Sequence, residues 1–156
     1  MKFNIMKNII PLSFLLILLS GCGPESRSGW IEMPVPDQYG EDSGKIFLQV
    51  YGQELSDDLE EAVITYATIS DLITGGEKTM FTIILNGKSS SDVVFVETPD
   101  DQVHEFNCYD GIIFNIDSEE HDLDRMIDLM KHEKLTFRQG KHSFTISTTG
   151  FSKKLT

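Results

Sequence analysis

The feature that most constrains this chain is a cysteine, Cys22, that directly follows a short apolar run near the amino terminus. Lys2 and Lys7 precede the run, and residues 9–19 are almost entirely apolar. Such a run is too short to span a bilayer as a helix, which takes about 20 residues. A positively charged start followed by a short apolar stretch is typical of a signal peptide. We therefore predict that residues 1–21 are a signal peptide and that the folded part lies behind Cys22.

The residues at the end of the run, Leu19-Ser20-Gly21-Cys22, resemble the lipobox of bacterial lipoproteins. The resemblance implies diacylglycerol on the Cys22 thiol, cleavage before Cys22 and acylation of the new amino terminus. Several acyl chains would hold the protein on a membrane, because each buried CH₂ contributes about 0.8 kcal/mol. Gly23 stands where an aspartate would retain such a protein in the inner membrane, so the resemblance implies the outer membrane, facing the periplasm. The alternative is an ordinary secretory peptide that happens to precede a cysteine.

Length and charge narrow the possible functions of the remaining chain. Removal of residues 1–21 leaves 135 of the 156 residues, which is enough for one domain. The loss of Lys2 and Lys7 leaves 11 basic residues against 25 acidic ones, a net charge of −14. A chain this acidic does not favour nucleic acid or an anionic lipid surface as a partner. The charge provides solubility in a crowded compartment and also suits a basic protein partner.

The second cysteine, Cys108, has no partner for a disulfide within the mature chain if Cys22 carries lipid. Cys108 is then a buried apolar residue, half of an intermolecular bridge or a reactive thiol. We expect it to be buried, because free cysteine is among the most buried residue types.

Residues 22–44 are rich in proline, glycine and acidic or hydroxyl side chains, a composition that indicates a tether between lipid and domain. Trp30 is the exception within this segment, since a lone tryptophan flanked by Ile31 and Met33 more often packs on a domain edge than stays in solvent.

Residues 45–156 have the pattern of an antiparallel β-sandwich-like domain with one amphipathic helix before the last hairpin. Asn86-Gly87 and Asp110-Gly111 predict tight hairpin turns, because these residue types tolerate positive φ. Gln139-Gly140 predicts the turn of the last hairpin. The segments expected to form strands are 46–51, 63–69, 79–85, 93–96, 103–109, 112–116, 135–138 and 143–147.

The predicted helix begins with Asp117 as a cap and Glu120 closing a capping box. Its apolar stripe at helical spacing is expected to cover one face of a sheet. The stripe consists of Leu123, Met126, Ile127 and Met130, and the outer face of Glu119, Asp122, Asp124, Arg125 and Asp128.

No set of residues in the sequence indicates a catalytic, cofactor or metal site. The neighbouring His–acid pairs at 104–105, 121–124 and 132–133 do not match the ligand spacing of zinc or calcium sites. His104 and Cys108 would lie about 13 Å apart on an extended strand, at roughly 3.3 Å per residue, too far for a hydrogen bond. Ser147, Thr148 and Thr149 lack the Gly-x-Ser-x-Gly elbow of a serine hydrolase.

Several segments between residues 103 and 155 resemble the exported invasion-associated locus B family. The segments are Phe106-Asn107-Cys108, the amphipathic helix, a Leu-Thr-Phe strand and the closing stretch from Ser147 to Leu155. The resemblance implies a β-sandwich-like exported fold with a non-enzymatic role and no site that can be transferred. That family usually has a second cysteine soon after the first, whereas here Gly111 is followed by Ile112, so the disulfide is missing.

The sequence therefore predicts a periplasmic domain, attached to the membrane through Cys22, that is not an enzyme and binds another protein or supports the envelope. The alternative is an immunity protein that neutralises a periplasmic toxin, since an acidic surface can cover a basic active site.

Overall fold

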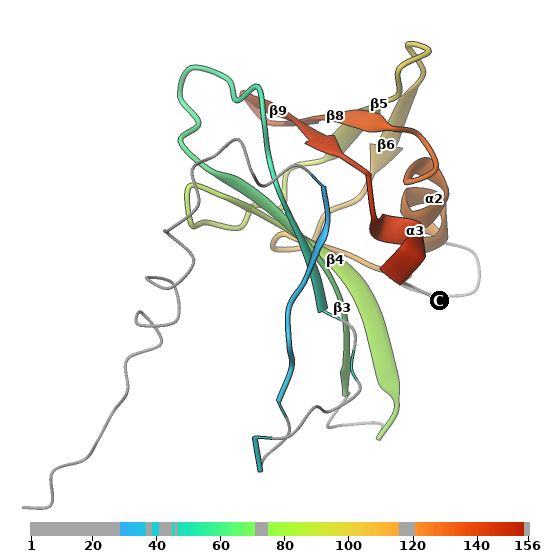
Figure 1. The fold of residues 1–156 in the computed structure, drawn as a ribbon. Helices are drawn as coiled ribbons and strands as arrows, with labels where there is room; N and C mark the ends of the chain where they lie inside the picture. Colours follow the sequence, from blue (N-terminus) through green and yellow to red (C-terminus); the bar gives the residue numbers. More distant parts are fainter. Residues whose placement is uncertain are drawn as a thin grey trace, which may run out of the picture.

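The computed structural model describes residues 29–36, 39–40, 45, 47–70, 75–115 and 121–154. They form two antiparallel sheets, with one short helix before the final hairpin (Figure 1). The predicted mainly β, sandwich-like fold is confirmed.

The first sheet has five strands and is built around one long hairpin. Its central pair, β3 (Ala62–Ser70) and β4 (Glu77–Leu85), is rich in β-branched residues, which fit a pleated surface. The complete order across the five-stranded sheet is β1 (Ile31–Glu32), β2 (Phe47–Tyr51), β3, β4 and β7 (Ile112–Ile113).

The second sheet has four strands and contains the last hairpin of the chain, β8 (Lys134–Gln139) and β9 (His142–Ser147). This hairpin turns at Gly140, which has φ of 57°, as the Gln139-Gly140 prediction requires. The order across the four-stranded sheet is β6 (Val103–Phe106), β5 (Val94–Glu97), β8 and β9.

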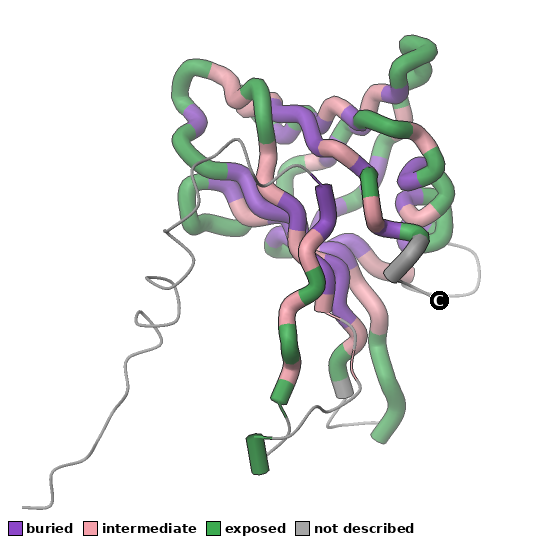
Figure 2. Tube along the Cα trace, in the orientation of Figure 1, coloured by how far each residue is buried: buried purple, intermediate pink, exposed green. Residues whose placement is uncertain are grey.

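The core lies between the inner faces of the two sheets and continues beneath the helices, and Figure 2 shows buried residues alternating with intermediate and exposed ones along the strands. Trp30 is 4% exposed and packs against Phe81 and Phe151 at centroid distances of 6.2 and 4.9 Å. Residues 29–36 of the expected tether thus belong to the folded body, since β1 also pairs with β2. Side chains that are at most 1% exposed include Leu48, Val50, Ile64, Ile83, Val94, Val96, Phe137, Phe144 and Ile146.

The two Xaa-Gly turns have the predicted backbone but do not join the predicted strands. Asn86 and Gly87 have φ of 49° and 72°, and Asp110 and Gly111 have φ of 50° and 80°. Each turn closes a short local bridge, after which the chain passes from one sheet to the other. The predicted hairpins between 79–85 and 93–96 and between 103–109 and 112–116 are therefore wrong, because the flanking strands lie in different sheets.

The buried face of helix α2 (Asp122–Leu129) overlaps the predicted stripe but also includes Asp122 and Leu129. Leu123, Met126 and Met130 are buried as expected, but Ile127 is only half-buried and Leu129 is buried. His121 occupies the N-cap position without a side-chain cap bond, and the expected capping residues 117 and 120 lie outside the described residues. A second helix, α3 (Phe151–Lys154), closes the chain and places Phe151 in the core.

Candidate functional site

The predicted lipidation site, Cys22, lies outside the described residues, which begin at Gly29. Within the part of the chain that the structure does describe, no helix has the length and apolar character to cross a bilayer.

Cys108 lies directly after β6 and is 4% exposed, so the prediction that it is buried is confirmed. Its Sγ donates to the carbonyl oxygen of Ser90 at 3.4 Å. Burial raises the pKa of the Cys108 thiol above its ordinary value, which reduces its reactivity because the thiolate is the nucleophile. His104 is half-buried on β6 and pairs with Val96.

The histidines lie on separate elements rather than in one cluster. His104 is on β6, His121 precedes α2, His132 follows α2 and His142 begins β9. His121 Nδ1 lies 3.5 Å from Asp124 Oδ2. Of the neighbouring His–acid pairs in the sequence, this is the one whose side chains form an ion-pair contact among the described residues. Nowhere in the described part of the chain do three or more His, Cys, Asp or Glu side chains converge as a metal site requires.

The hydroxyl groups near the C-terminus fix the backbone between β9 and α3. Thr148 Oγ1 donates to the carbonyl oxygen of His132, and Ser147 Oγ donates to Thr149 Oγ1 at 3.0 Å. Trp30 N–H donates to the carbonyl oxygen of Thr149 at 3.0 Å, so this segment also holds the entry to β1. The bonds position Phe151 in the core and leave these hydroxyls with a structural role.

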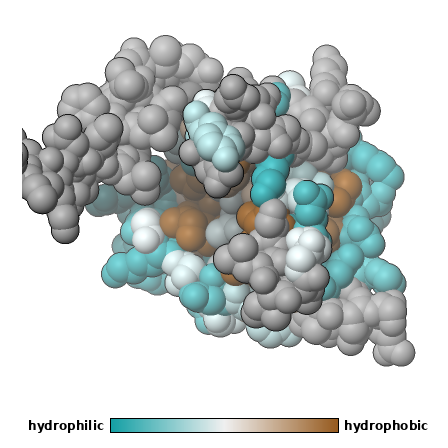
Figure 3. Space-filling model, turned by 90° about the horizontal axis from the view of Figure 1, so that it is seen from below, coloured by the Kyte–Doolittle hydropathy of each residue, from teal (hydrophilic) through white to brown (hydrophobic). Residues whose placement is uncertain are grey.

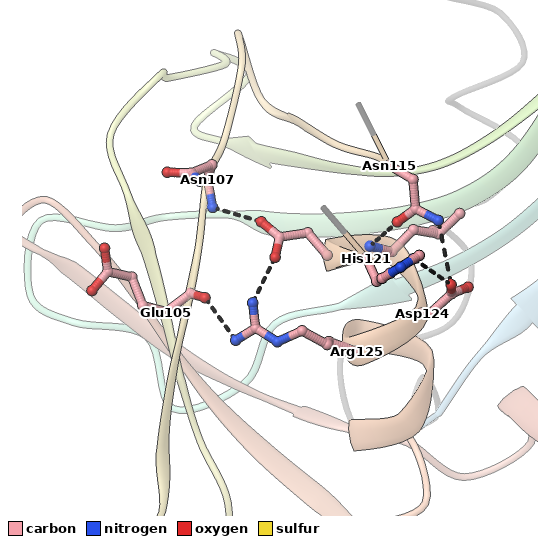
Figure 4. A network of polar contacts seen from close by, with 8 residues as sticks. Glu105, Asn107, Asn115, His121, Asp124 and Arg125 are labelled. Carbon is pink, nitrogen blue, oxygen red and sulfur yellow. Dashed lines mark hydrogen bonds and ion pairs between the residues drawn. The ribbon is translucent and has the colours of Figure 1, made fainter. Parts of the chain in front are cut away.

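Asp122, predicted to be on the outer face of the helix, is instead 7% exposed and anchors a polar network (Figure 4). Its carboxylate accepts from Asn107 N–H at 3.1 Å and from Arg125 Nη1 at 2.6 Å. Arg125 Nη2 also donates to the carbonyl oxygen of Glu105 at 3.0 Å, and the guanidinium lies 4.7 Å from the centre of the Phe106 ring. The Asp122 carboxylate can be buried because the Arg125 guanidinium compensates its charge and both of its oxygens accept hydrogen bonds.

The network continues at the start of the helix through Asn115. Its Oδ1 accepts from Leu123 N–H at 2.9 Å, which supplies the bond that His121 does not make as a cap. Its Nδ2 donates to Asp124 Oδ2 at 3.4 Å. The contacts in Figure 4 tie α2 to the segments at both ends of residues 105–115, so the network fixes the position of the helix.

A polar cavity of about 460 Å³ lies where the turn after β4 meets the tip of the β8–β9 hairpin. Gln139 is 2% exposed there, and its Nε2 donates to the carbonyl oxygen of Asp92 at 2.9 Å. Gln139 Oε1 and His142 Nδ1 are buried without a hydrogen-bond partner in the described structure. Lys141, which also lines the cavity, donates to Asp58 at 2.6 Å.

The cavity was not predicted, because its walls come from segments that are distant in sequence. One wall is the segment after β4, which the second Xaa-Gly turn holds from behind. Ser89 Oγ donates to Asp110 Oδ1 at 2.5 Å, and Gly111 N–H donates to the carbonyl oxygen of Ser90 at 2.7 Å. Its size and polarity suit ordered water or a small polar molecule.

Comparison with known proteins gives this chain no relative: no family model, no curated protein and no solved structure matches it. The resemblance of residues 103–155 to the invasion-associated locus B family therefore stays a prediction, and function must be argued from the chain itself.

Proposed function

We propose that this protein is a lipoprotein of the outer membrane, anchored through Cys22 and facing the periplasm, whose β-domain binds another protein and is not an enzyme. The observation that carries the proposal is the segment Leu19-Ser20-Gly21-Cys22 behind a short apolar run. The folded body begins by Trp30, only eight positions after Cys22, so an anchored domain would lie close to the membrane surface.

The distribution of charge supports a basic protein as the partner. Five of the basic side chains in the described structure are engaged by carboxylates, and the 25 acidic residues of the chain outnumber its 13 Lys and Arg residues. An uncompensated negative field steers cationic partners toward the protein and repels anionic ones. The same observation favours the second candidate, an immunity protein that covers the basic site of a periplasmic toxin. The five pairs are Arg125–Asp122, Lys131–Asp128, Lys134–Glu54, Arg138–Glu97 and Lys141–Asp58.

The anchor is tested by metabolic labelling with palmitate in a bacterial host. The full chain should incorporate label and sediment with outer membranes, whereas Cys22→Ser should do neither. Cys108→Ala is the matched control, because it removes the other cysteine and should leave labelling unchanged. If the unmodified chain takes up no palmitate, the anchor proposal is wrong.

The binding role is tested by affinity isolation from detergent-solubilised native envelopes. A partner that is released by salt, as expected for a charge-driven contact, supports the proposal. Recovery of a toxin, encoded beside this protein, would favour the immunity role over a role in envelope support.

A further inference from the structure

The outer face of the five-stranded sheet, which points away from the second sheet, is mostly apolar. Strand register assigns the side chains to faces, because directly paired residues share a face and successive residues alternate. The inner side holds the rows Leu48–Tyr66–Phe81 and Val50–Ile64–Ile83. The opposite side, named here the apolar outer face, consists of Ile31, Phe47, Gln49, Tyr51, Val63, Thr65, Ala67, Ile69, Lys78, Met80, Thr82, Ile84 and Ile112.

This face contains no aspartate or glutamate, although the whole chain has 25 acidic residues. The outer face of the four-stranded sheet is different, because it presents Glu97, Glu105, Lys134 and Arg138 to solvent. We call this second surface the charged outer face. Its remaining outward positions are Phe95, Val103, Thr136, Ser143, Thr145 and Ser147.

The described elements pack against the inner side of the five-stranded sheet and leave its outer side uncovered. Trp30 and Phe151 contact the inward Phe81, and Phe151 also contacts the inward Tyr66 at a centroid distance of 5.3 Å. The buried residues of α2, Leu123, Met126 and Leu129, belong to the same core cluster as Tyr66 and Phe81, which places α2 on this inner side as well. Figure 1 shows the second sheet, α2 and α3 together on one side of the β3–β4 hairpin.

The side chains of the apolar outer face are only partly shielded by one another. Most are of intermediate exposure, and Ile69 is 46% exposed. Seen from the lower end of the molecule, hydrophobic residues show between hydrophilic ones (Figure 3). An outward residue recurs every second position along a strand, at roughly 3.4 Å per residue, and strands lie roughly 4.8 Å apart, so each outward residue covers about 33 Å² of the sheet. The thirteen outward residues therefore cover on the order of 400 Å², without the additional area of protruding side chains. Eight of the thirteen outward residues are apolar and cover roughly 260 Å² by the same estimate. This approaches the largest apolar patch of a typical monomer, which often has a function.

We infer that the apolar outer face is a contact surface for a second copy of this chain, with two five-stranded sheets stacked face to face. Two copies that each carry a net charge of −12, or −14 without residues 1–21, repel one another over most of their surfaces. The face without acids is where they can approach with least repulsion. A second copy also brings the flat, apolar, similarly twisted surface that the first requires, and two sheets pack with their strands about 30° apart.

The area predicts a weak homodimer. A stable interface buries about 800 Å² on each partner, and the face, at about 400 Å², supplies only about half of that. Attachment of both copies to one membrane would raise their effective concentration and favour pairing without further contacts. The inference goes beyond the binding role proposed above, because a second copy is acidic whereas the partner proposed there is basic, and it does not depend on the lipid.

The test is cross-linking of the full chain in native membranes with a bismaleimide that spans about 10 Å, the distance between stacked sheets. Thr65→Cys places a thiol at the centre of the apolar outer face, and Thr136→Cys places one on the charged outer face. We expect the dimer yield of Thr65→Cys to exceed that of both the unmodified chain and Thr136→Cys by about tenfold, because only the first thiol faces its symmetry mate. Equal yields for the two variants, or no dimer from Thr65→Cys, would overturn the inference.

A second pair of variants separates a specific contact from random collision. Gln49 lies beside Thr65 on the same face, so Gln49→Asp in the Thr65→Cys background places opposing carboxylates in the interface. The dimer yield should fall about tenfold, whereas Ser143→Asp, on the charged outer face, should leave it unchanged. Unchanged yield with Gln49→Asp would also overturn the inference. Palmitate uptake is measured on the same samples, so loss of the anchor and loss of the dimer are recorded independently.

Discussion

The two outer faces of this sandwich follow the same strand geometry but differ in chemistry. On the four-stranded sheet, outward positions carry an ion pair between Arg138 and Glu97 at 3.4 Å, with Glu105 on the neighbouring strand. On the five-stranded sheet, no outward position is acidic, and Val63 and Ala67 are buried between the side chains of adjacent strands. An antiparallel sheet needs only one buried face, so an apolar second face implies an additional contact.

The largest effect is expected from an acid placed at a buried position of the apolar outer face. Ala67 is 6% exposed and lies between Phe47 and Met80, so Ala67→Asp would bury a carboxylate without a partner. The free energy of unfolding should fall by about 2–4 kcal/mol. Urea unfolding followed by circular dichroism measures it.

The matched change on the charged outer face is Ser143→Asp, beside Arg138. It should alter the free energy of unfolding by no more than about 0.5 kcal/mol. If both substitutions cost the same, the two faces do not differ in their access to water and the comparison fails.

Truncation of one apolar side chain on each face should give a smaller difference between the faces in the free energy of unfolding. Met80 is half-buried beside Ala67, whereas Val103 is 52% exposed on the charged outer face. Met80→Ala should lower the free energy of unfolding by about 1 kcal/mol, and Val103→Ala by less than about 0.5 kcal/mol. Thermal melts of both variants at a concentration too low for pairing report this packing alone. A cost for Val103→Ala equal to that for Met80→Ala would show that exposure does not distinguish the faces.

The strand pattern could be predicted from the sequence, but the difference between the outer faces could not. In β3, apolar residues occupy both alternating sets of positions, so periodicity identifies a strand without showing which side meets the core. The register with β2 and β4 decides this, and register is set by contacts between segments that are distant in sequence.

The hairpins predicted at the two Xaa-Gly turns and the exposed position predicted for Asp122 are wrong for the same reason, because each depends on contacts between segments that are distant in sequence. Asn86-Gly87 and Asp110-Gly111 adopt the positive φ that their residue types favour, which is a local property. The strand that follows each turn is chosen by packing, and it lies in the other sheet. Helical spacing likewise predicts Asp122 on the outer face of the helix, whereas hydrogen bonds from Asn107 and Arg125 allow its carboxylate to be buried.

The exposed ion pair on the charged outer face should contribute little to the free energy of unfolding. The side chains of Arg138 and Glu97 are 49% and 35% exposed, so water competes with their interaction. Glu97→Gln should lower the free energy of unfolding by no more than about 0.5 kcal/mol, and the difference should vanish in about 1 M salt, where charges are screened within roughly 3 Å. A loss that persists in high salt would assign Glu97 a role other than charge pairing.

The smallest effect is expected in acid, and it should again appear on the charged outer face. Lys134 lies at the edge of that face and donates to Glu54 Oε2 at 2.7 Å. This hydrogen bond, with a second from Thr145, holds the pKa of Glu54 below its ordinary value. A carboxyl group whose pKa is lower in the folded state stabilises the fold above the unfolded pKa, and the stabilisation is lost as pH falls through the folded pKa.

Stability should therefore decline below the ordinary glutamate pKa of about 4.3, and Glu54→Gln should remove a small part of that decline. Thr65→Val on the apolar outer face should leave the shape of the pH profile unchanged, because it alters no titratable group. Urea midpoints between pH 3 and pH 7 for the unmodified chain and the two variants give the comparison. The contribution of the apolar outer face to stability would then be independent of pH, whereas that of the charged outer face would fall in acid. A steeper loss of stability in acid for Thr65→Val would contradict that difference.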